Sequence, residues 1–194
     1  MSYEKIRNVK LNKKNNIIEV DYADNNIYPL IWRKSQYCNS NNEKYQNLSF
    51  EDKLLLLFND FENGNFSISV INNNTSNIMY ALLKARAVMK EMGLNSFDVY
   101  MSYSDNESLQ KMKDFYGIAF NAFVNALYEE NKSECILYNG VYYIGKLGNY
   151  NERNGGYTKY YYGYNKERAL KMSYKKAFIV QKNFDKSGFA IECI

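Results

Sequence analysis

Histidine is missing from the 194-residue sequence, which also contains one proline and three cysteines. Imidazole titrates near neutral pH without help, and it serves as the base in Ser-His-Asp and Cys-His systems and as a common metal ligand. Those mechanisms are therefore excluded. An enzyme with this sequence would need carboxylates, lysine, tyrosine or thiolate, each with a shifted pKa or a metal.

The three cysteines, Cys38, Cys135 and Cys193, are far apart and include no Cys-x-x-Cys pair. A zinc site requires closely spaced ligands, so this spacing argues against one. An odd number of isolated cysteines is typical of free thiols in a reducing compartment. We therefore expect all three to be reduced, with no disulfide and no bound transition metal.

Long apolar runs are also missing. The longest aliphatic run is Leu54–Leu57, and the first residues, MSYEKIRNVKLNKKNN, contain no apolar signal-peptide core. Neither a membrane span nor a signal peptide fits, so we expect an intracellular, cytoplasmic protein. Lysine outnumbers arginine 20 to 5, and 28 residues are asparagine. This bias toward A/T-rich codons indicates a low-GC bacterium or one of its phages.

Alternating apolar residues, turn signals and helix caps predict an α+β fold with a mixed sheet in the first half. Strands 66–71 and 97–103, with a helix between them, should form a β-α-β unit with parallel strands. The other elements expected there are two or three strands within 5–34 around the polar turn Lys13–Asn16, a helix from Ser49 to Asn63–Gly64, and a helix from about Thr75 to Gly93.

The second half predicts an antiparallel meander in the order α-β-β-β-α. Its expected elements are a helix over 105–130 that is weak at Gly117, strands 135–138 and 141–144 around an Asn139-Gly140 turn, a strand 157–163, a helix 165–181 and a short strand 189–193. In that two-residue hairpin, Tyr138 would pair with Val141. We expect a single domain, 1–194, with a loose division into closely packed subdomains 1–103 and 104–194.

This order of elements resembles the double-stranded-RNA-binding domain, a family whose last helix opens with a Gly-x-Ser-Lys-Lys-x-Ala-Lys run. The segment GYNKERA matches that run at Gly163, Lys166 and Ala169. The resemblance covers residues 105–181 and implies an RNA-binding domain. The tight Asn139-Gly140 turn departs from the family, which has a longer loop there that enters the minor groove.

Positive charge and tyrosine gather near the C-terminus. Residues 146–186 hold ten basic and three acidic residues, and nine of the 20 tyrosines lie within 138–164. On a helix over 165–181, four cations would share one face, and tyrosines on an open sheet face could stack on unpaired bases. The predicted contacts with nucleic acid or a partner are Lys159, Arg168, Lys171, Lys175, Lys182, Tyr160 and Tyr162. The alternatives are a solvated helix face and tyrosines that pack both faces of the sheet.

Three hypotheses for function follow. The leading one is a non-catalytic binding protein of a phage or other mobile element that contacts nucleic acid, or a host nucleoprotein effector, with an anti-CRISPR-type inhibitor of host defence as one specific role. The second is a histidine-free, metal-dependent enzyme acting on nucleic acid or nucleotides through Asp21, Asp24 and Glu51. The third is an oligomeric interaction protein with the Tyr-rich sheet as its interface. No cofactor and no membrane partner is expected.

Overall fold

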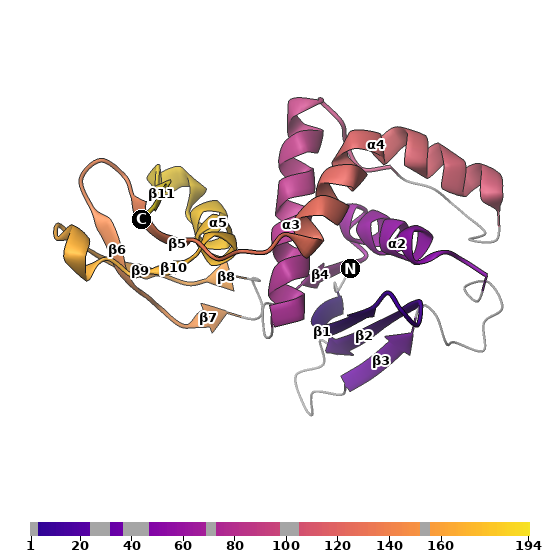
Figure 1. The fold of residues 1–194 in the computed structure, drawn as a ribbon, viewed down its shortest axis with the longest axis horizontal. Helices are drawn as coiled ribbons and strands as arrows, with labels where there is room; N and C mark the ends of the chain where they lie inside the picture. The colour runs from indigo at the N-terminus through magenta and orange to yellow at the C-terminus, as the bar shows by residue number, and fades with distance from the viewer. Residues whose placement is uncertain (1–3, 24–31, 37–46, 69–72, 98–104, 152–155) are drawn as a thin grey trace. The chain divides into compact units, whose positions relative to one another are not determined.

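The α+β class is confirmed by a computed structural model (Figure 1). The chain divides into two compact units, residues 1–126 and 127–194. The sequence placed a loose division near residue 104, whereas helix α4 (Asn106–Tyr128) lies mostly within the first unit. In the described part of the chain, no helix could span a membrane. The structure describes residues 4–23, 32–36, 47–68, 73–97, 105–151 and 156–194.

The first unit is built on a four-stranded sheet in the order β3-β2-β1-β4. Its strands are β1 (Glu4–Asn12), β2 (Ile17–Ala23), β3 (Trp32–Gln36) and β4 (Phe66–Ile68). The predicted polar turn joins β1 to β2, and Asn16 closes it with a φ of 56°. Strand β1 pairs with β4 in parallel. The expected strand 97–103 lies almost entirely outside the described residues.

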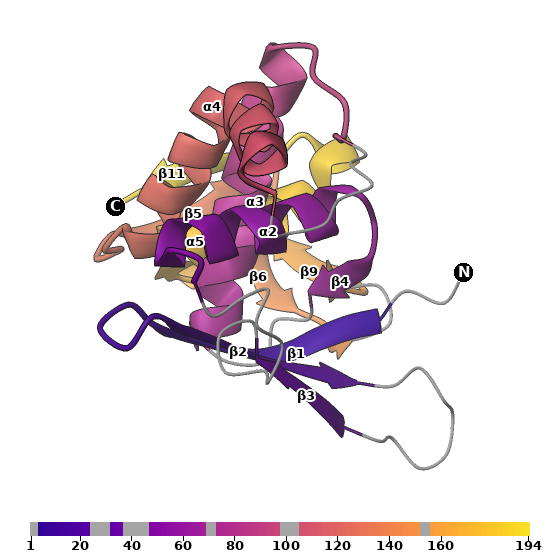
Figure 2. The same ribbon diagram turned by 90° about the vertical axis from the view of Figure 1, so that its right-hand side faces the viewer.

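Helices α2 (Phe50–Glu62) and α3 (Asn73–Glu91) contact this sheet, and Figure 2 shows α2 between the sheet and α4. Ser49 caps α2 as predicted, because its side chain accepts a hydrogen bond from the Asp52 amide at 3.1 Å. The face of α2 that packs against α4 is aromatic. The Phe58 ring stacks on Phe123 with their centroids 5.3 Å apart, and its centroid lies 4.8 Å from that of Tyr116. The predicted weak point, Gly117, kinks α4 with a φ of 25°.

The second unit contains a five-stranded sheet. In this sheet β5 pairs with β10, β6 and β11, and β6 pairs in turn with β9. Helix α5 (Tyr174–Asn183) contacts β5 and β11 and contributes Ala177 and Val180 to the core. A separate short pair, β7 with β8, precedes β9. The strands are β5 (Glu134–Tyr138), β6 (Tyr143–Leu147), β7 (Tyr150–Asn151), β8 (Gly156–Tyr157), β9 (Tyr160–Gly163), β10 (Met172–Ser173) and β11 (Ala190–Cys193).

The expected two-residue hairpin is wrong in register. Tyr138 pairs with Tyr143, not Val141, so the loop has four residues. The Asn139 side chain is the physical reason, because its Oδ1 accepts hydrogen bonds from the amides of Val141 and Tyr142 at 3.2 and 2.9 Å. An asparagine that bonds the backbone ahead of it forms a turn of its own. The shift is two residues, so each side chain keeps its face and only its partner across the hairpin changes.

The helix expected over 165–181 is also wrong. Lys166–Arg168 form a 3-10 turn, η1, and Met172 pairs with Cys135 as part of β10 before α5 begins. Ser173 caps α5 by accepting a hydrogen bond from the Lys176 amide. The residues that suggested the double-stranded-RNA-binding domain, Gly163, Lys166 and Ala169, therefore lie before the last helix and not at its start. The local sequence does not support that resemblance.

The expectation of three reduced cysteines is contradicted by a disulfide between Cys135 and Cys193. The two residues are directly opposite each other on β5 and β11. The next pair along the strands is hydrogen-bonded, since the Ile194 amide donates to the Glu134 carbonyl at 2.9 Å. The cysteines thus occupy a non-hydrogen-bonded position, where opposite side chains approach most closely. Sequence spacing could not reveal this pairing, because it depends on the register of strands 58 residues apart.

Candidate nucleic-acid interface

The two faces of the second unit's sheet differ in what covers them. Opposite residues in a sheet share a face, and Ile144 and Leu147 pair with Tyr162 and Tyr160. Ile144 belongs to the core with Ala177 and Val180 of α5, so this is the inner face. Gly145 forms an irregularity in β6, after which Lys146 pairs with Tyr161 on the opposite, outer face.

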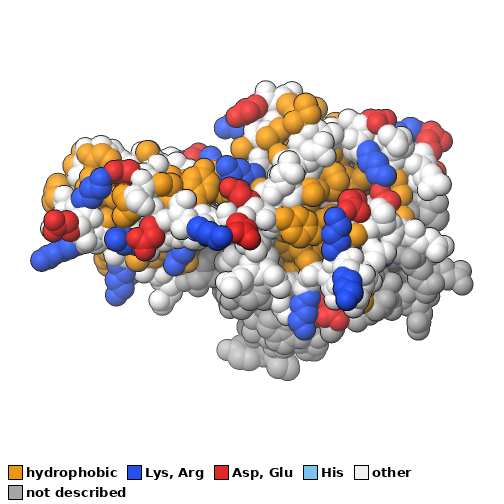
Figure 3. Space-filling view, in the orientation of Figure 1, with side chains coloured by type: hydrophobic (Ala, Val, Ile, Leu, Met, Phe, Trp, Pro, Cys, Tyr) orange, Lys and Arg blue, Asp and Glu red, His pale blue; other side chains and the backbone are white. Residues whose placement is uncertain are grey.

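The outer face carries tyrosines and lysines in contact. The Tyr138 and Tyr143 rings stack with their centroids 4.5 Å apart. On the same face, the amines of Lys146 and Lys159 lie 5.9 and 5.3 Å from the Tyr161 ring centroid. Figure 3 shows basic side chains interleaved with hydrophobic ones, tyrosine included, over this unit. We call Tyr138, Tyr143, Lys146, Lys159 and Tyr161 the Tyr-Lys face.

Tyr161 is the centre of this face and is 48% exposed. A hydrogen bond from Lys159 and the charges of Lys159 and Lys146 lower the pKa of Tyr161, and the same contact raises the pKa of Lys159. Gly148 makes room for Lys159, because a Cβ on Gly148 would lie 2.6 Å from the Lys159 Cγ. The aromatic ring and both cations are thus held at one exposed place.

One ion pair borders the Tyr-Lys face. Lys166 pairs with Glu192, which lies on the outer face of β11 opposite Ile136. The hydrogen bond to Glu192 raises the pKa of Lys166, and the nearby Tyr143 adds to this effect. Positive charge at this border is therefore already compensated. Among the described residues, no acidic side chain forms an ion pair with Lys146 or Lys159, which supply the remaining positive charge of the face.

The predicted cationic helix face does not exist as such, because two of its four members precede α5. Arg168 is exposed in η1, and Lys171, in the segment before β10, forms an ion pair with Glu134 at 3.2 Å. Lys175 is 9% exposed, and burial lowers its pKa. Lys182 lies over the Phe178 ring in the last turn of α5, 3.8 Å from Asp185. The four cations therefore do not share one helix face.

The three other predicted contact residues have different positions. Tyr160 belongs to the inner face, where its ring packs against Phe184 and Phe189 at centroid distances of 4.7 and 5.1 Å. Tyr162 is 58% exposed and contacts Tyr142 at 4.4 Å. Lys159 lies on the Tyr-Lys face. Sequence reasoning missed Lys146, Tyr143 and Tyr161, because the face of Lys146 depends on the irregularity at Gly145, and the exposure of the two tyrosines depends on which face α5 covers.

The carboxylates proposed for a metal-dependent enzyme occupy ordinary structural positions where they are described. Asp21 accepts a hydrogen bond from Asn8 at 2.9 Å, and Glu51 pairs with Lys13 at 3.2 Å in the first turn of α2. Asp24 lies outside the described residues. Within the described ranges, no group of three or more histidine, cysteine or acidic residues could hold a metal ion.

The Tyr-Lys face offers two kinds of contact to a nucleic acid. An exposed tyrosine ring can stack on a nucleobase, and the flanking ammonium groups can contact phosphates. Comparisons of the chain with protein-family models, with curated proteins and with solved structures found no match.

Proposed function

We propose that this protein is a non-catalytic binding protein whose second unit binds single-stranded nucleic acid on the Tyr-Lys face. The observation that carries the proposal is Tyr161, an exposed ring with two lysine amines 5.3 and 5.9 Å from its centroid. Stacking on a side chain requires an accessible base face. A duplex buries its base faces, so this arrangement favours unpaired bases.

The expected energetics follow from the two kinds of contact. Stacking of one base on an aromatic side chain contributes about 1–3 kcal/mol and depends little on sequence. Each lysine–phosphate contact lowers the slope of log K against log salt by roughly 0.7 for a single strand. With Lys146 and Lys159 as the main contacts, we expect weak, salt-sensitive and sequence-tolerant binding.

The test is fluorescence anisotropy with labelled single-stranded and double-stranded oligonucleotides of equal length at about 50 mM salt, where phosphate contacts are strong. Tyr161→Ala should weaken single-strand binding roughly 5- to 100-fold. Lys146→Gln with Lys159→Gln should flatten the salt slope by about two contacts. The matched control is Lys111→Gln with Lys132→Gln, since both lysines are exposed and lie outside the Tyr-Lys face.

A single-strand affinity no greater than the duplex affinity would contradict the proposal. So would equal losses in the Lys146/Lys159 and Lys111/Lys132 double variants, because such a result would indicate nonspecific attraction to a basic protein. Absence of measurable binding to either oligonucleotide would exclude direct nucleic-acid contact by this face.

A protein interface is the second candidate, and a different cluster favours it. Tyr142, Tyr162 and Tyr164 have ring centroids 4.4 and 5.1 Å apart, and Tyr164 is 75% exposed. Neighbouring Val141 is 54% exposed. Exposed aromatic residues are enriched at the centres of protein interfaces. Light scattering over a concentration series, with Tyr164→Ser as the variant, tests self-association: an oligomer that the variant dissociates would support it.

A further inference from the structure

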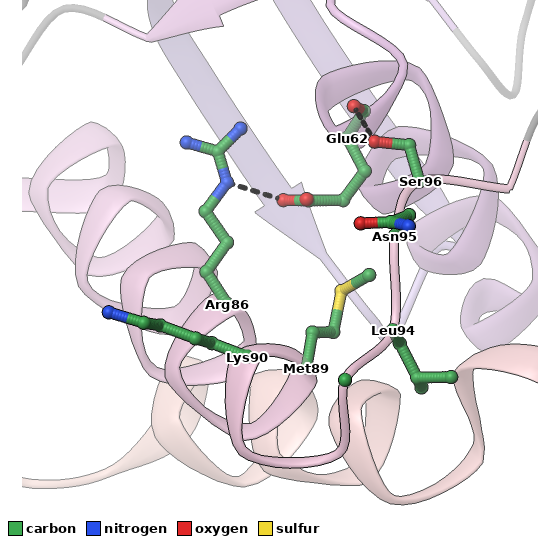
Figure 4. A pocket seen from close by; sticks show the side chains of 8 residues that line it. Glu62, Arg86, Met89, Lys90, Leu94, Asn95 and Ser96 are labelled. Atoms are coloured by element: carbon green, nitrogen blue, oxygen red, sulfur yellow. Dashed lines mark hydrogen bonds and ion pairs between the residues drawn. The ribbon is translucent and has the colours of Figure 1, made fainter.

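The first unit carries a pocket of about 440 Å³ that neither function above uses (Figure 4). Glu62, the last residue of α2, forms one wall. Arg86, Met89 and Lys90 form a stripe along the final turns of α3, and the segment Leu94–Ser96 closes the third side. Small-molecule sites usually have volumes of about 300–1,000 Å³, so the pocket has room for a metabolite-sized ligand.

The pocket is preformed because hydrogen bonds fix the segment that closes it. Gly93 ends α3 in the left-handed region with a φ of 68°, and the Leu94 amide donates to the Met89 carbonyl at 2.9 Å. The Ser96 hydroxyl donates to the backbone carbonyl of Glu62 at 2.6 Å. The walls therefore need little ordering when a ligand binds, which reduces the entropic cost of binding.

Glu62 and Arg86 place opposite charges side by side in this pocket. The Glu62 side chain is 7% exposed, and its Oε1 accepts a hydrogen bond from Arg86 Nε at 2.7 Å. Burial raises the pKa of Glu62, and the Arg86 charge opposes that effect. A buried carboxylate with one cationic neighbour is costly to desolvate, and such groups often serve to recognise a ligand.

Arg86 has hydrogen-bonding capacity to spare. Its guanidinium lies 4.1 Å from the Phe61 ring centroid, and Figure 4 shows its two terminal nitrogens directed away from Glu62. Among the described residues, no acceptor bonds those two nitrogens. A guanidinium held by its Nε and by a ring presents its remaining N–H groups as a fork that matches phosphate or carboxylate oxygens. The exposed Lys90 lies one helical turn further along and adds a second positive charge.

The lining requires a ligand with three chemical features. Arg86 and Lys90 can bind an oxyanion, and the Glu62 carboxylate, which already accepts one hydrogen bond from Arg86, can accept another from an N–H or O–H donor. Met89 and Leu94 provide an apolar wall. Inorganic phosphate would contact the cations but would make no contact with the carboxylate or the apolar wall. A nucleoside monophosphate has all three features, and guanine presents two adjacent N–H donors of the kind a carboxylate accepts.

We infer that this pocket binds a nucleoside monophosphate, with the phosphate on Arg86 and Lys90 and a guanine base between Met89, Leu94 and the Glu62 carboxylate. The inference is independent of the Tyr-Lys face, because all of these residues belong to the first unit.

Calorimetric titration of the full chain with GMP, guanosine and inorganic phosphate tests this inference. GMP should bind at least tenfold more tightly than either fragment. Arg86→Gln should weaken GMP binding at least tenfold, in line with loss of a charged hydrogen bond. Glu62→Gln should weaken GMP and guanosine binding but should not weaken phosphate binding, because it removes a negative charge beside Arg86.

Lys90→Gln keeps the test decisive if Arg86→Gln does not fold, because Lys90 is exposed. It should weaken GMP binding about 1.5- to 5-fold, as expected for an exposed charge–phosphate contact. The matched control is Lys111→Gln, an exposed lysine on α4 that should not change GMP binding. GMP that binds no better than inorganic phosphate, or Lys90→Gln indistinguishable from Lys111→Gln, would overturn the inference.

Discussion

Replacing Tyr116 with phenylalanine removes one buried oxygen from the first unit and leaves the ring in place. The Tyr116 hydroxyl donates to Asn59 Oδ1 at 3.0 Å and accepts from the Phe97 amide at 3.3 Å. Asn63 Nδ2 also donates to Asn59 Oδ1, at 3.0 Å, so the asparagine keeps a partner in the variant. The Phe97 amide loses its partner. We expect Tyr116→Phe to lower the free energy of unfolding by about 1–2 kcal/mol near neutral pH.

The pH dependence gives a second, independent magnitude. Burial, with a contribution from the charges of Glu62 and Asp60, raises the pKa of Tyr116 to about 12. The unfolded-state pKa is about 10, so between these values the unfolded chain binds one proton fewer than the folded chain. The free energy of unfolding should therefore decrease with rising pH, by about 1.4 kcal/mol per pH unit. The contribution is fully present below pH 10 and lost as the pH approaches 12.

Tyr116→Phe lacks this titration, so the two proteins should differ in slope as well as in level. Urea unfolding followed by circular dichroism, at pH 8 and at steps up to pH 11.5, measures both. The initial advantage of the natural protein should vanish near pH 11. Tyr162→Phe, which changes an exposed phenol, should match the natural protein at pH 8. Parallel curves for Tyr116→Phe and the natural protein across this range would refute the reasoning.

Three further substitutions test other parts of the structure. Gly117→Ala should destabilise the first unit by about 1–3 kcal/mol, because an L-residue at a φ of 25° is strained; unchanged urea midpoints would contradict this. Cys193→Ser should lower the stability of the second unit by roughly 4 kcal/mol in the chain-entropy model, since the disulfide closes a loop of 58 residues. Mass spectrometry of the natural protein without reductant should show two hydrogens fewer than the fully reduced chain. Lys175→Met should not weaken oligonucleotide binding, because this side chain is 9% exposed; an affinity loss equal to that of Lys159→Gln would restore the predicted helix face.

Elements with strong local signals could be predicted from the sequence. Ser49 before an apolar run defines the start of α2, and Asn63–Gly64 defines its end. Both signals act within one helical turn, so no distant contact is needed to interpret them. The strands on either side of the Lys13–Asn16 turn were predictable for the same reason.

The second unit shows where local signals fail. Apolar and basic residues over 165–181 follow helical spacing, yet Met172 pairs with Cys135 and Ser173 starts the helix instead. Strand pairing across more than thirty residues outweighed the local periodicity there. The irregularity at Gly145 shifted the register within β6 by one residue, so that Lys146 lies on the same face as Tyr143 and Tyr161, as the two-residue period of strands requires.

The candidate sites depend on the same long-range information. Strand pairing places Tyr161 opposite Lys146. Arg86 of α3 contacts Glu62 of α2, although the two residues are 24 positions apart in the sequence. Composition identifies a lysine- and tyrosine-rich region. It could not show which of those residues are exposed, because exposure depends on register and on which face α5 covers.

The parallel pairing of β1 with β4 sets an order of events during synthesis. Strand β1 can form a hairpin with β2 as soon as both have left the ribosome. The other edge of β1 stays unpaired until Phe66–Ile68, which forms β4, has been synthesised. Until then the edge is open to pairing with other chains, and its closure depends on bringing together segments far apart in the sequence. Nascent chains halted between β2 and β4 should therefore be the aggregation-prone species, and folding of the first unit should lag behind formation of its first hairpin.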